Sequence, residues 1–307
     1  MKFMRYRARY VAAMVVVVAL VVGVFLVQRS VTAPRASAAA GSSFSAFYLD
    51  VGASTSLGFQ PTGIVHHNGR RTNTGYANDL LEVEKIKGVS LTLVQLGCPG
   101  ETVQTILGPT PINKCYKAPE TQMTQAVAFL KAHQGVAGLV TIDLGFNNIR
   151  NCVAVMPVNE ACANTAIAAV QVDMPKVVRE LKAAAGPRVR FVGLEFEDPF
   201  LADYLRGSTG PSNATASLAA VSRLNAVLAQ AFGRNGVAVA NVPAIFQSTN
   251  TTPVTLTNVG VIPENVYQAC QLTWQCYGLP FGPDDHPNDA GYALIAQAIA
   301  AVLPKSW

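Results

Sequence analysis

The sequence predicts a three-layer α/β domain built around a parallel sheet of five strands. Two observations support this fold class. Short runs of apolar and β-branched residues alternate with stretches whose apolar residues recur every three or four positions, as in βαβ units. Each short run is also apolar almost throughout, as expected of a parallel strand that helices cover on both faces. At 307 residues the chain is long enough to bury a full core without a structural metal.

The five predicted strands occupy residues 46–51, 89–96, 138–144, 188–194 and 237–242. Three helical stripes of apolar residues follow the second, fourth and fifth of them. These stripes are Met123, Val127 and Leu130; Leu218, Val221, Leu224 and Leu228; and Leu294, Ile295, Ile299 and Val302. The sequence has no internal repeat and no interdomain linker, so we expect one domain over residues 41–307, with long loops at one edge of the sheet.

The composition excludes several classes of protein. Half of the residues are apolar and only 13% are charged, which is unlike a disordered regulator or a coiled-coil rod. The net charge is +5, but residues 1–40 hold six Lys or Arg and no Asp or Glu. The remainder has 17 basic and 18 acidic residues, and no basic cluster that would bind nucleic acid. We therefore expect a small-molecule partner and a monomeric protein.

The first 40 residues have the layout of an export signal. A basic start is followed by an apolar run over residues 11–27 and by small residues that end at Ala40. The run is at the short limit of a membrane-spanning helix, about 17 residues, so an uncleaved N-terminal anchor is the alternative. Both interpretations place the domain outside the cytoplasm, either secreted or held at the outer face of the membrane.

Six cysteines agree with this location, because an even number in an exported chain favours disulfides. Their order suggests three local pairs, although the sequence alone leaves other connectivities open. The pairs are Cys98 with Cys115, Cys152 with Cys162, and Cys270 with Cys276. No C-x-x-C pair, zinc-finger spacing, P-loop or dinucleotide fingerprint is present, so neither a metal nor a cofactor is expected.

Candidate catalytic residues follow the predicted strands, at the sheet edge where α/β proteins bind their ligands. Ser54 comes directly after the first strand. A serine hydroxyl needs a base within hydrogen-bond reach, and His286, just before the final helix, is the best candidate. His133 lies in a helical pattern, and His66 and His67 lie in a polar loop.

Hydrogen-bond donors follow the next two strands. Gly100 lies in a Cys-Pro-Gly-Glu-Thr segment after the second strand, and Asn147 lies in a Gly-Phe-Asn-Asn segment after the third. A glycine lets its backbone N–H approach a ligand, and an asparagine amide is a side-chain donor. Together with the Ser54 amide, they could form an oxyanion hole.

Four blocks in this order, GAST, CPGET, GFNN and DDHPNDAGY, resemble the SGNH (GDSL) hydrolase superfamily, in its exported three-disulfide esterase and lipase branch. The resemblance extends over residues 47–303. It implies a flavodoxin-like α/β/α fold with a five-stranded parallel sheet. It also implies Ser54 as nucleophile, His286 as general base and acid, and Gly100 and Asn147 as oxyanion-hole donors.

Three positions depart from the family pattern. Ala53 stands where an aspartate usually precedes the serine, and Asn148 stands where an aspartate usually follows the oxyanion asparagine. Pro283 occupies the position of the acid that is expected three residues before the histidine. We therefore expect a Ser-His dyad, with a backbone carbonyl near Pro283 or the Asp284 side chain orienting the imidazole.

The sequence thus predicts a secreted or surface-anchored serine esterase or lipase that acts on a small-molecule or lipid ester. A carbohydrate O-deacetylase of the same family is one alternative. A surface binding module that has lost its activity is another, motivated by Ala53 and the missing acid. A classical α/β-hydrolase is disfavoured because the chain has no G-x-S-x-G elbow. Phe146 and Trp274 are the aromatic residues that we expect to line the pocket.

Overall fold

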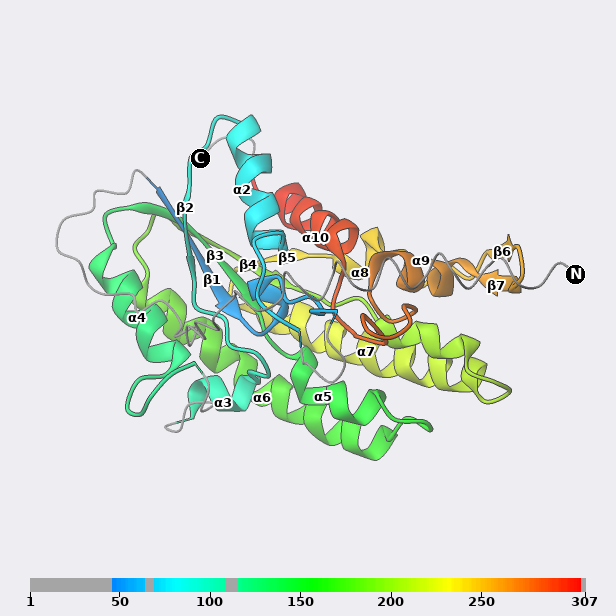
Figure 1. The fold of residues 1–307 in the computed structure, drawn as a ribbon. Coiled ribbons are helices and arrows are strands. Elements are labelled where there is room, and N and C mark those ends of the chain that lie inside the picture. Colours follow the sequence, from blue (N-terminus) through cyan, green and yellow to red (C-terminus); the bar gives the residue numbers. More distant parts are fainter. Residues whose placement is uncertain (1–45, 64–68, 109–114, 305–307) are drawn as a thin grey trace, which may run out of the picture. The chain divides into compact units, whose positions relative to one another are not determined.

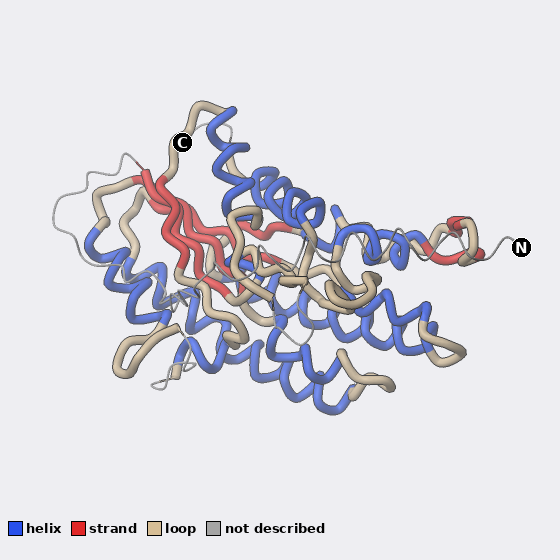
Figure 2. The backbone as a smooth tube through the Cα atoms, in the orientation of Figure 1, coloured by secondary structure: helices blue, strands red, loops and turns tan. Residues whose placement is uncertain are grey.

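The computed structural model describes residues 46–63, 69–108 and 115–304, and it contains the predicted parallel sheet. The predicted leader, His66 and His67 lie outside the described residues. The sheet has the strand order β2-β1-β3-β4-β5, and Figure 1 shows it between helices while Figure 2 traces its strands in red. The strands are β1 (Ala46–Gly52), β2 (Thr92–Gln95), β3 (Ala137–Asp143), β4 (Val189–Leu194) and β5 (Ala238–Ala240). All pairings are parallel, which confirms the predicted fold class and all five strands.

Two strands are shorter than predicted, and both lie at the edges of the sheet. The sequence predicted β2 over residues 89–96 and β5 over residues 237–242. An edge strand has a hydrogen-bonding neighbour on one side only, so apolar residues at its ends can leave the ladder without disrupting the sheet. Apolar content predicted these strands, but the partner strand sets how far each extends.

Helices cover both faces of the sheet, and the alternation of strand side chains determines which residues meet them. Phe47 and Leu49 of β1 pack in one cluster, whereas Tyr48 between them packs in the other. The first cluster includes α3 (Val103–Leu107), α4 (Gln122–Ala132), α5 (Phe146–Val153), α6 (Glu160–Ala184) and α7 (Gly210–Arg234). The second includes α2 (Tyr76–Ile86), α8 (Val242–Ile245) and α10 (Asp289–Val302). The three predicted stripes lie on α4, α7 and α10.

A small antiparallel hairpin was not predicted. It pairs β6 (Pro253–Leu256) with β7 (Gly260–Pro263) and leads into α9 (Glu264–Leu272), at the end of α9 away from the five-stranded sheet (Figure 1). Its strands are short and bury little, and Val261 is 62% exposed. A strand that packs little apolar surface has weak alternation in its sequence, and so gives little signal.

The described part of the chain contains all three predicted disulfides. Cys98 bonds Cys115, Cys152 bonds Cys162, and Cys270 bonds Cys276, and no described cysteine is free. Each bond closes a loop of 6 to 17 residues beside an element of the domain. Three such bonds suggest an extracellular protein. None of the described helices has the length and apolar content that crossing a membrane requires.

The register of the central strands determines where the candidate residues meet. β1 and β3 pair from Ala46 with Ala137 to Gly52 with Asp143, so both strands end at the same level. The chain segments that follow, which carry Ser54 and Asn147, therefore leave the sheet side by side.

The centre of this sheet should be the least tolerant part of the domain. Ile142 on β3 is fully buried between the two neighbouring strands, and Ile142→Ala should lower the free energy of unfolding by about 2–5 kcal/mol. The control is Val172→Ala on α6, where the side chain is 62% exposed and the change should stay within about 0.5 kcal/mol. Urea unfolding measures both, and equal effects at the two positions would contradict the packing described.

Candidate active site

Ser54 lies in a rigid turn that follows β1. The Ser54 carbonyl accepts hydrogen bonds from Leu57 N–H at 3.0 Å and Phe59 N–H at 3.2 Å, which closes the short helix η2 (Thr55–Leu57). Below the turn, the Gln122 amide of α4 binds both backbone groups of Gly52, at 2.7 and 2.9 Å. The end of β1 is therefore fixed on both sides, and the Ser54 hydroxyl is held at the sheet edge.

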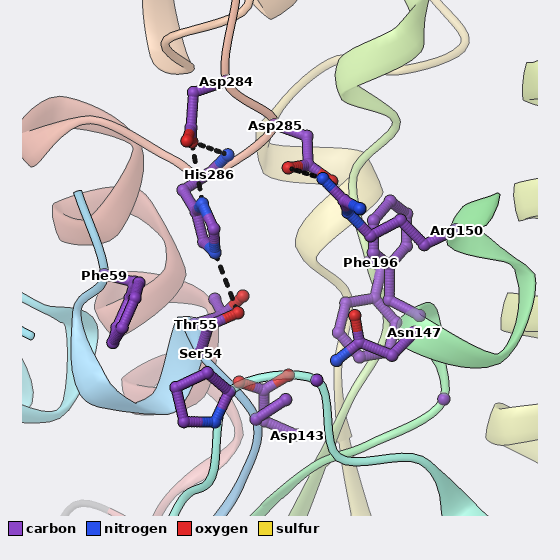
Figure 3. A pocket seen from close by; sticks show the side chains of 15 residues that line it. Ser54, Thr55, Phe59, Asp143, Asn147, Arg150, Phe196, Asp284, Asp285 and His286 are labelled. Carbon is purple, nitrogen blue, oxygen red and sulfur yellow. Dashed lines mark hydrogen bonds and ion pairs between the residues drawn. The ribbon is translucent and has the colours of Figure 1, made fainter. Parts of the chain in front are cut away.

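His286 contacts Ser54 directly, although 232 positions separate the two residues. The distance from His286 Nε2 to Ser54 Oγ is 2.8 Å, and His286 Nδ1 lies 2.7 Å from Asp284 Oδ1 (Figure 3). With Nδ1–H donating to the carboxylate, Nε2 is left free to accept the hydroxyl proton. The structure therefore brings together the predicted serine and histidine, and it adds a carboxylate to them.

Of the two orienting groups considered from the sequence, the Asp284 side chain is the one that contacts the imidazole. Asp284 Oδ1 also accepts the backbone N–H of His286, at 2.9 Å. This bond from residue i+2 folds the aspartate side chain back along its own chain, as in an Asx turn. The carboxylate therefore reaches the ring from a position adjacent to it, and no backbone carbonyl near Pro283 is needed.

The loop that carries His286 is anchored to the end of α9. Trp274 N–H donates to the His286 carbonyl at 3.1 Å, and Asp284 N–H donates to the Trp274 carbonyl at 3.3 Å. Asn288 N–H binds the Leu272 carbonyl at 2.9 Å, while the Asn288 side chain caps α10. The Cys270–Cys276 disulfide closes the short loop that contains Trp274. The segment that anchors the His286 loop is therefore itself restrained.

A second ion pair lies next to the histidine. Arg150 of α5 donates two hydrogen bonds to Asp285, from Nε to Oδ2 at 2.5 Å and from Nη2 to Oδ1 at 2.9 Å. Burial by itself would raise the pKa of Asp285, but the Arg150 hydrogen bond and the nearby His286 charge hold that pKa below its ordinary value. Asp285 is therefore a charged, paired neighbour of the imidazole, and sequence analysis did not identify the pair.

These charges also act on His286. Burial by itself would lower the pKa of the imidazole, but the Asp284 hydrogen bond and the charges of Asp285 and Asp284 raise it above 6.5 overall. The environment thus favours the protonated ring more than water does. Such an arrangement stabilises the imidazolium that forms when a histidine accepts a proton during a reaction.

The predicted hydrogen-bond donors line the same cavity as Ser54 and His286. The cavity has a volume of about 400 Å³, and Gly100 and Asn147 both line it. Gly100 has φ of +86°, which a side chain would oppose, and Asn147 Nδ2 donates to the Glu101 carbonyl at 3.1 Å. Figure 3 shows Asn147 facing the cavity from α5, opposite Ser54. The structure therefore brings the four predicted residues to one cavity.

Asn148 and Ala53, the two nearby positions that depart from the family pattern, differ in their surroundings. Asn148 Oδ1 accepts the Val103 N–H at 3.2 Å, and its amide donates to Gln104 Oε1. Asn148 thus ties α5 to α3, and it does not line the cavity. Ala53 does line the cavity and is nearly fully buried.

Aromatic side chains form much of the cavity wall. Phe146 and Phe196 lie 5.6 Å apart between ring centroids, and Phe59 lies 5.7 Å from the His286 ring. Phe146 lines the cavity as expected, whereas Trp274 does not. The Trp274 indole N–H donates to Gln60 Oε1 at 3.2 Å, and its ring stacks on Phe281. Phe59 therefore lies beside the histidine, whereas Phe146 and Phe196 form a separate apolar wall next to Asn147.

Buried Asp143 lines the cavity, and two further buried carboxyl groups, Asp50 and Glu197, interact with it; sequence analysis did not single them out. Burial and the nearby Asp50 raise the pKa of Asp143 to about 8, and burial raises the pKa of Asp50 to about 7. Thr141 and Tyr76 both donate to Asp50, each at 2.9 Å. Burial also raises the pKa of Glu197 to about 7. Of these three groups Asp143 lines the cavity, and its raised pKa favours the neutral carboxyl at neutral pH.

One group of side chains among the described residues has the composition of a metal site. It consists of Asp284, Asp285 and His286, whose ligand-type atoms lie within 4.8 Å of one another. All three already have protein partners, because Asp284 and Ser54 hold the imidazole and Arg150 holds Asp285. His133, the other described histidine, contacts the Phe129 carbonyl through Nδ1 at 2.8 Å, away from the cavity.

The chain is similar to known proteins in its sequence pattern and in its fold. A model of the GDSL-like lipase/acylhydrolase family matches residues 39–294. A phospholipase A1 from Streptomyces albidoflavus NA297 is similar in structure, with a TM-score of 0.55 and 18% identity over 83% of this chain and 98% of that one. An extracellular lipase from Streptomyces rimosus has a TM-score of 0.53 and 18% identity over 84% of this chain and 100% of that one. No curated protein matches the chain.

The titration of His286 tests the imidazole geometry. In the native protein its pKa should lie above 6.5, because Asp284 and Asp285 stabilise the imidazolium. Asp284→Asn removes one charge and should lower the pKa relative to the native protein. NMR titration of the histidine ring protons measures this, with the His286→Gln spectrum to assign the signal. An unchanged pKa in Asp284→Asn would show that the carboxylate does not contact the ring.

The buried carboxyls should make stability fall as pH rises. The folded protein retains a proton on Asp143 up to about pH 8, whereas the unfolded chain loses it near 3.8. Stability from this group is present at low pH and is lost between these values. In Asp143→Asn, which mimics the neutral form, the decline between pH 5 and pH 8.5 should be smaller, by an amount on the order of a few kcal/mol. Urea unfolding at both pH values measures it, and parallel declines would contradict the raised pKa.

Proposed function

Because the chain belongs to the GDSL-like lipase/acylhydrolase family, we propose that it is a serine hydrolase of carboxylic esters with Ser54 as its nucleophile. The observation that carries this proposal is the continuous contact from Ser54 Oγ to His286 Nε2 at 2.8 Å and from His286 Nδ1 to Asp284 Oδ1 at 2.7 Å. A hydroxyl, a base and an orienting acid in this sequence are what nucleophilic catalysis by serine requires.

The proposed reaction has two stages. Ser54 Oγ attacks the ester carbonyl carbon while His286 Nε2 accepts the hydroxyl proton, and His286 then gives that proton to the departing alcohol oxygen. The acyl group remains on Ser54. In the second stage a water molecule gives a proton to His286 and attacks the acyl carbon, which releases the acid and restores the serine hydroxyl.

Gly100 N–H, Asn147 Nδ2 and the Ser54 N–H are the proposed donors to the negatively charged oxygen of each tetrahedral intermediate. Asn147 supports this role because its amide is already oriented by the Glu101 carbonyl. A donor fixed before the substrate arrives does not need to reorganise in the transition state.

Asp284 has the orienting role in this mechanism. Its carboxylate holds the ring through Nδ1 and stabilises the imidazolium that forms when His286 accepts a proton. The same contact weighs against an inactive binding module, because the missing acid was one observation that motivated that alternative. Ala53, the other one, leaves the Ser54 turn intact.

We further propose that residues 41–307 act outside the cytoplasm after export through the segment 1–40. The three disulfides support this location, because such bonds persist in oxidising compartments. The basic and apolar layout of residues 1–40 supports the export segment.

Removal of the nucleophile tests the proposal directly. The purified domain should hydrolyse p-nitrophenyl butyrate, and Ser54→Ala should lower kcat by about 10⁴-fold or more. Ser212→Ala, the same chemical change at an exposed position at the start of α7, should keep full activity. Undiminished turnover by Ser54→Ala would refute the assignment.

Removal of the side-chain donor tests the oxyanion hole. Asn147→Ala should lower kcat by about 10²- to 10³-fold with little change in KM, because the donor acts on charge that develops only in the transition state. Steady-state kinetics on the same ester measure both constants. A rise in KM at constant kcat would indicate that Asn147 binds the substrate without stabilising the oxyanion.

A further inference from the structure

A second cavity of about 380 Å³ adjoins the first. The two cavities share three lining residues, Arg150, Asp284 and Asp285. Figure 3 shows Asp285 next to Asp284 and His286, with Arg150 reaching Asp285 from α5. The second cavity therefore lies beyond the Arg150–Asp285 pair, along the loop that leads to His286.

This position is where the alcohol part of an ester would extend. In the proposed mechanism the carbonyl oxygen lies toward Gly100 and Asn147, and the departing alcohol oxygen receives its proton from His286. The alcohol carbon chain must therefore leave the reaction centre on the histidine side. The acyl chain is left with the aromatic wall of Phe146 and Phe196 in the first cavity.

Gln275 shows what kind of group the second cavity would bind. This residue is 8% exposed and lines the cavity, and within the described residues its side-chain amide has no hydrogen-bond partner. Its backbone N–H alone is bonded, to Thr273 Oγ1 at 3.2 Å. Because Gln275 lines the cavity, its amide can pair with a molecule that enters the cavity. An amide both donates and accepts, as does a hydroxyl group.

The charges around the cavity favour an uncharged ligand. Arg150 is paired with Asp285, and Arg206 lies 3.1 Å from Asp203, so both guanidinium groups have a carboxylate partner. With its charges balanced, the cavity has no excess charge to select an anion or a cation. Phe281, at 44% exposed, adds an apolar ring against which a carbon skeleton can pack.

We propose that the second cavity binds the alcohol part of the substrate, and that this alcohol is uncharged and carries several free hydroxyl groups, as in a glyceryl or sugar ester. Gln275 is the specificity-determining residue, because its amide pairs with a hydroxyl group of the alcohol. This inference rests on the proposed ester hydrolysis and adds the class of alcohol to it.

The test compares esters that share one acyl group. Glyceryl monobutyrate and 6-O-butyryl glucose carry hydroxyl-rich alcohols, whereas butyl butyrate does not. We expect the native protein to have a kcat/KM at least about tenfold higher for one of the hydroxyl-rich esters than for butyl butyrate. The better of the two identifies the alcohol as glyceryl or sugar.

Gln275→Met keeps the length of the side chain and removes its amide. It should lower kcat/KM for the preferred hydroxyl-rich ester by about tenfold, and it should leave p-nitrophenyl butyrate and butyl butyrate unchanged. Gln271→Met, at an exposed position at the end of α9, is the matched control and should behave as the native protein. The unchanged p-nitrophenyl ester also shows that the variant is folded.

Two results would overturn the inference while leaving ester hydrolysis intact. One is a native protein without preference for either hydroxyl-rich ester. The other is a Gln275→Met variant that loses activity equally on all esters, which would mean that Gln275 supports the His286 loop and binds no alcohol. Failure of the native protein on every ester, including p-nitrophenyl butyrate, would instead refute the proposed function.

Discussion

The site depends on one imidazole ring that is held between two oxygen atoms. His286 contacts Ser54 through one nitrogen and Asp284 through the other, and each oxygen is fixed by a different part of the chain. The turn after β1 holds the serine, and the backbone contact with the end of α9 holds the histidine loop. Neither segment could place the ring alone. The sheet and the α9 contact together determine the distance between hydroxyl and base, and the proposed chemistry depends on that distance.

The surroundings of this ring combine groups that are charged with groups that are kept neutral. Asp285 remains charged because Arg150 pairs with it, whereas Asp50 and Asp143 lie deeper and favour their protonated forms. Paired charge near the ring stabilises the imidazolium. Asp50 accepts hydrogen bonds from the Thr141 and Tyr76 side chains, and in its neutral form it brings no further negative charge to the site. Because burial raises the pKa values of Asp50 and Asp143, their contribution lowers the free energy of unfolding as the pH rises.

Sequence patterns predicted the sheet because a buried strand must be apolar and its helices must carry apolar stripes. Their position beside elements at one sheet edge made Ser54, Gly100, Asn147 and His286 candidates, and the family resemblance of the four blocks implied their roles. Sequence patterns left open whether Asp284 or a backbone carbonyl orients the ring, because the Asp284 contact depends on a turn that folds the side chain back onto the next residue but one. The Arg150–Asp285 pair and the lack of a partner for Gln275 depend on packing between distant segments, and local patterns carry no signal for either.

The most direct test of the account is the site of covalent labelling by a fluorophosphonate, which reacts with a serine hydroxyl only where a base has activated it. Intact mass spectrometry should show one adduct per chain, and peptide mapping should place it on Ser54. Labelling should also be lost when His286 is replaced by glutamine, because the hydroxyl then has no base. An unlabelled native protein, or an adduct on a serine other than Ser54, would contradict the central claim that Ser54 and His286 form an activated pair.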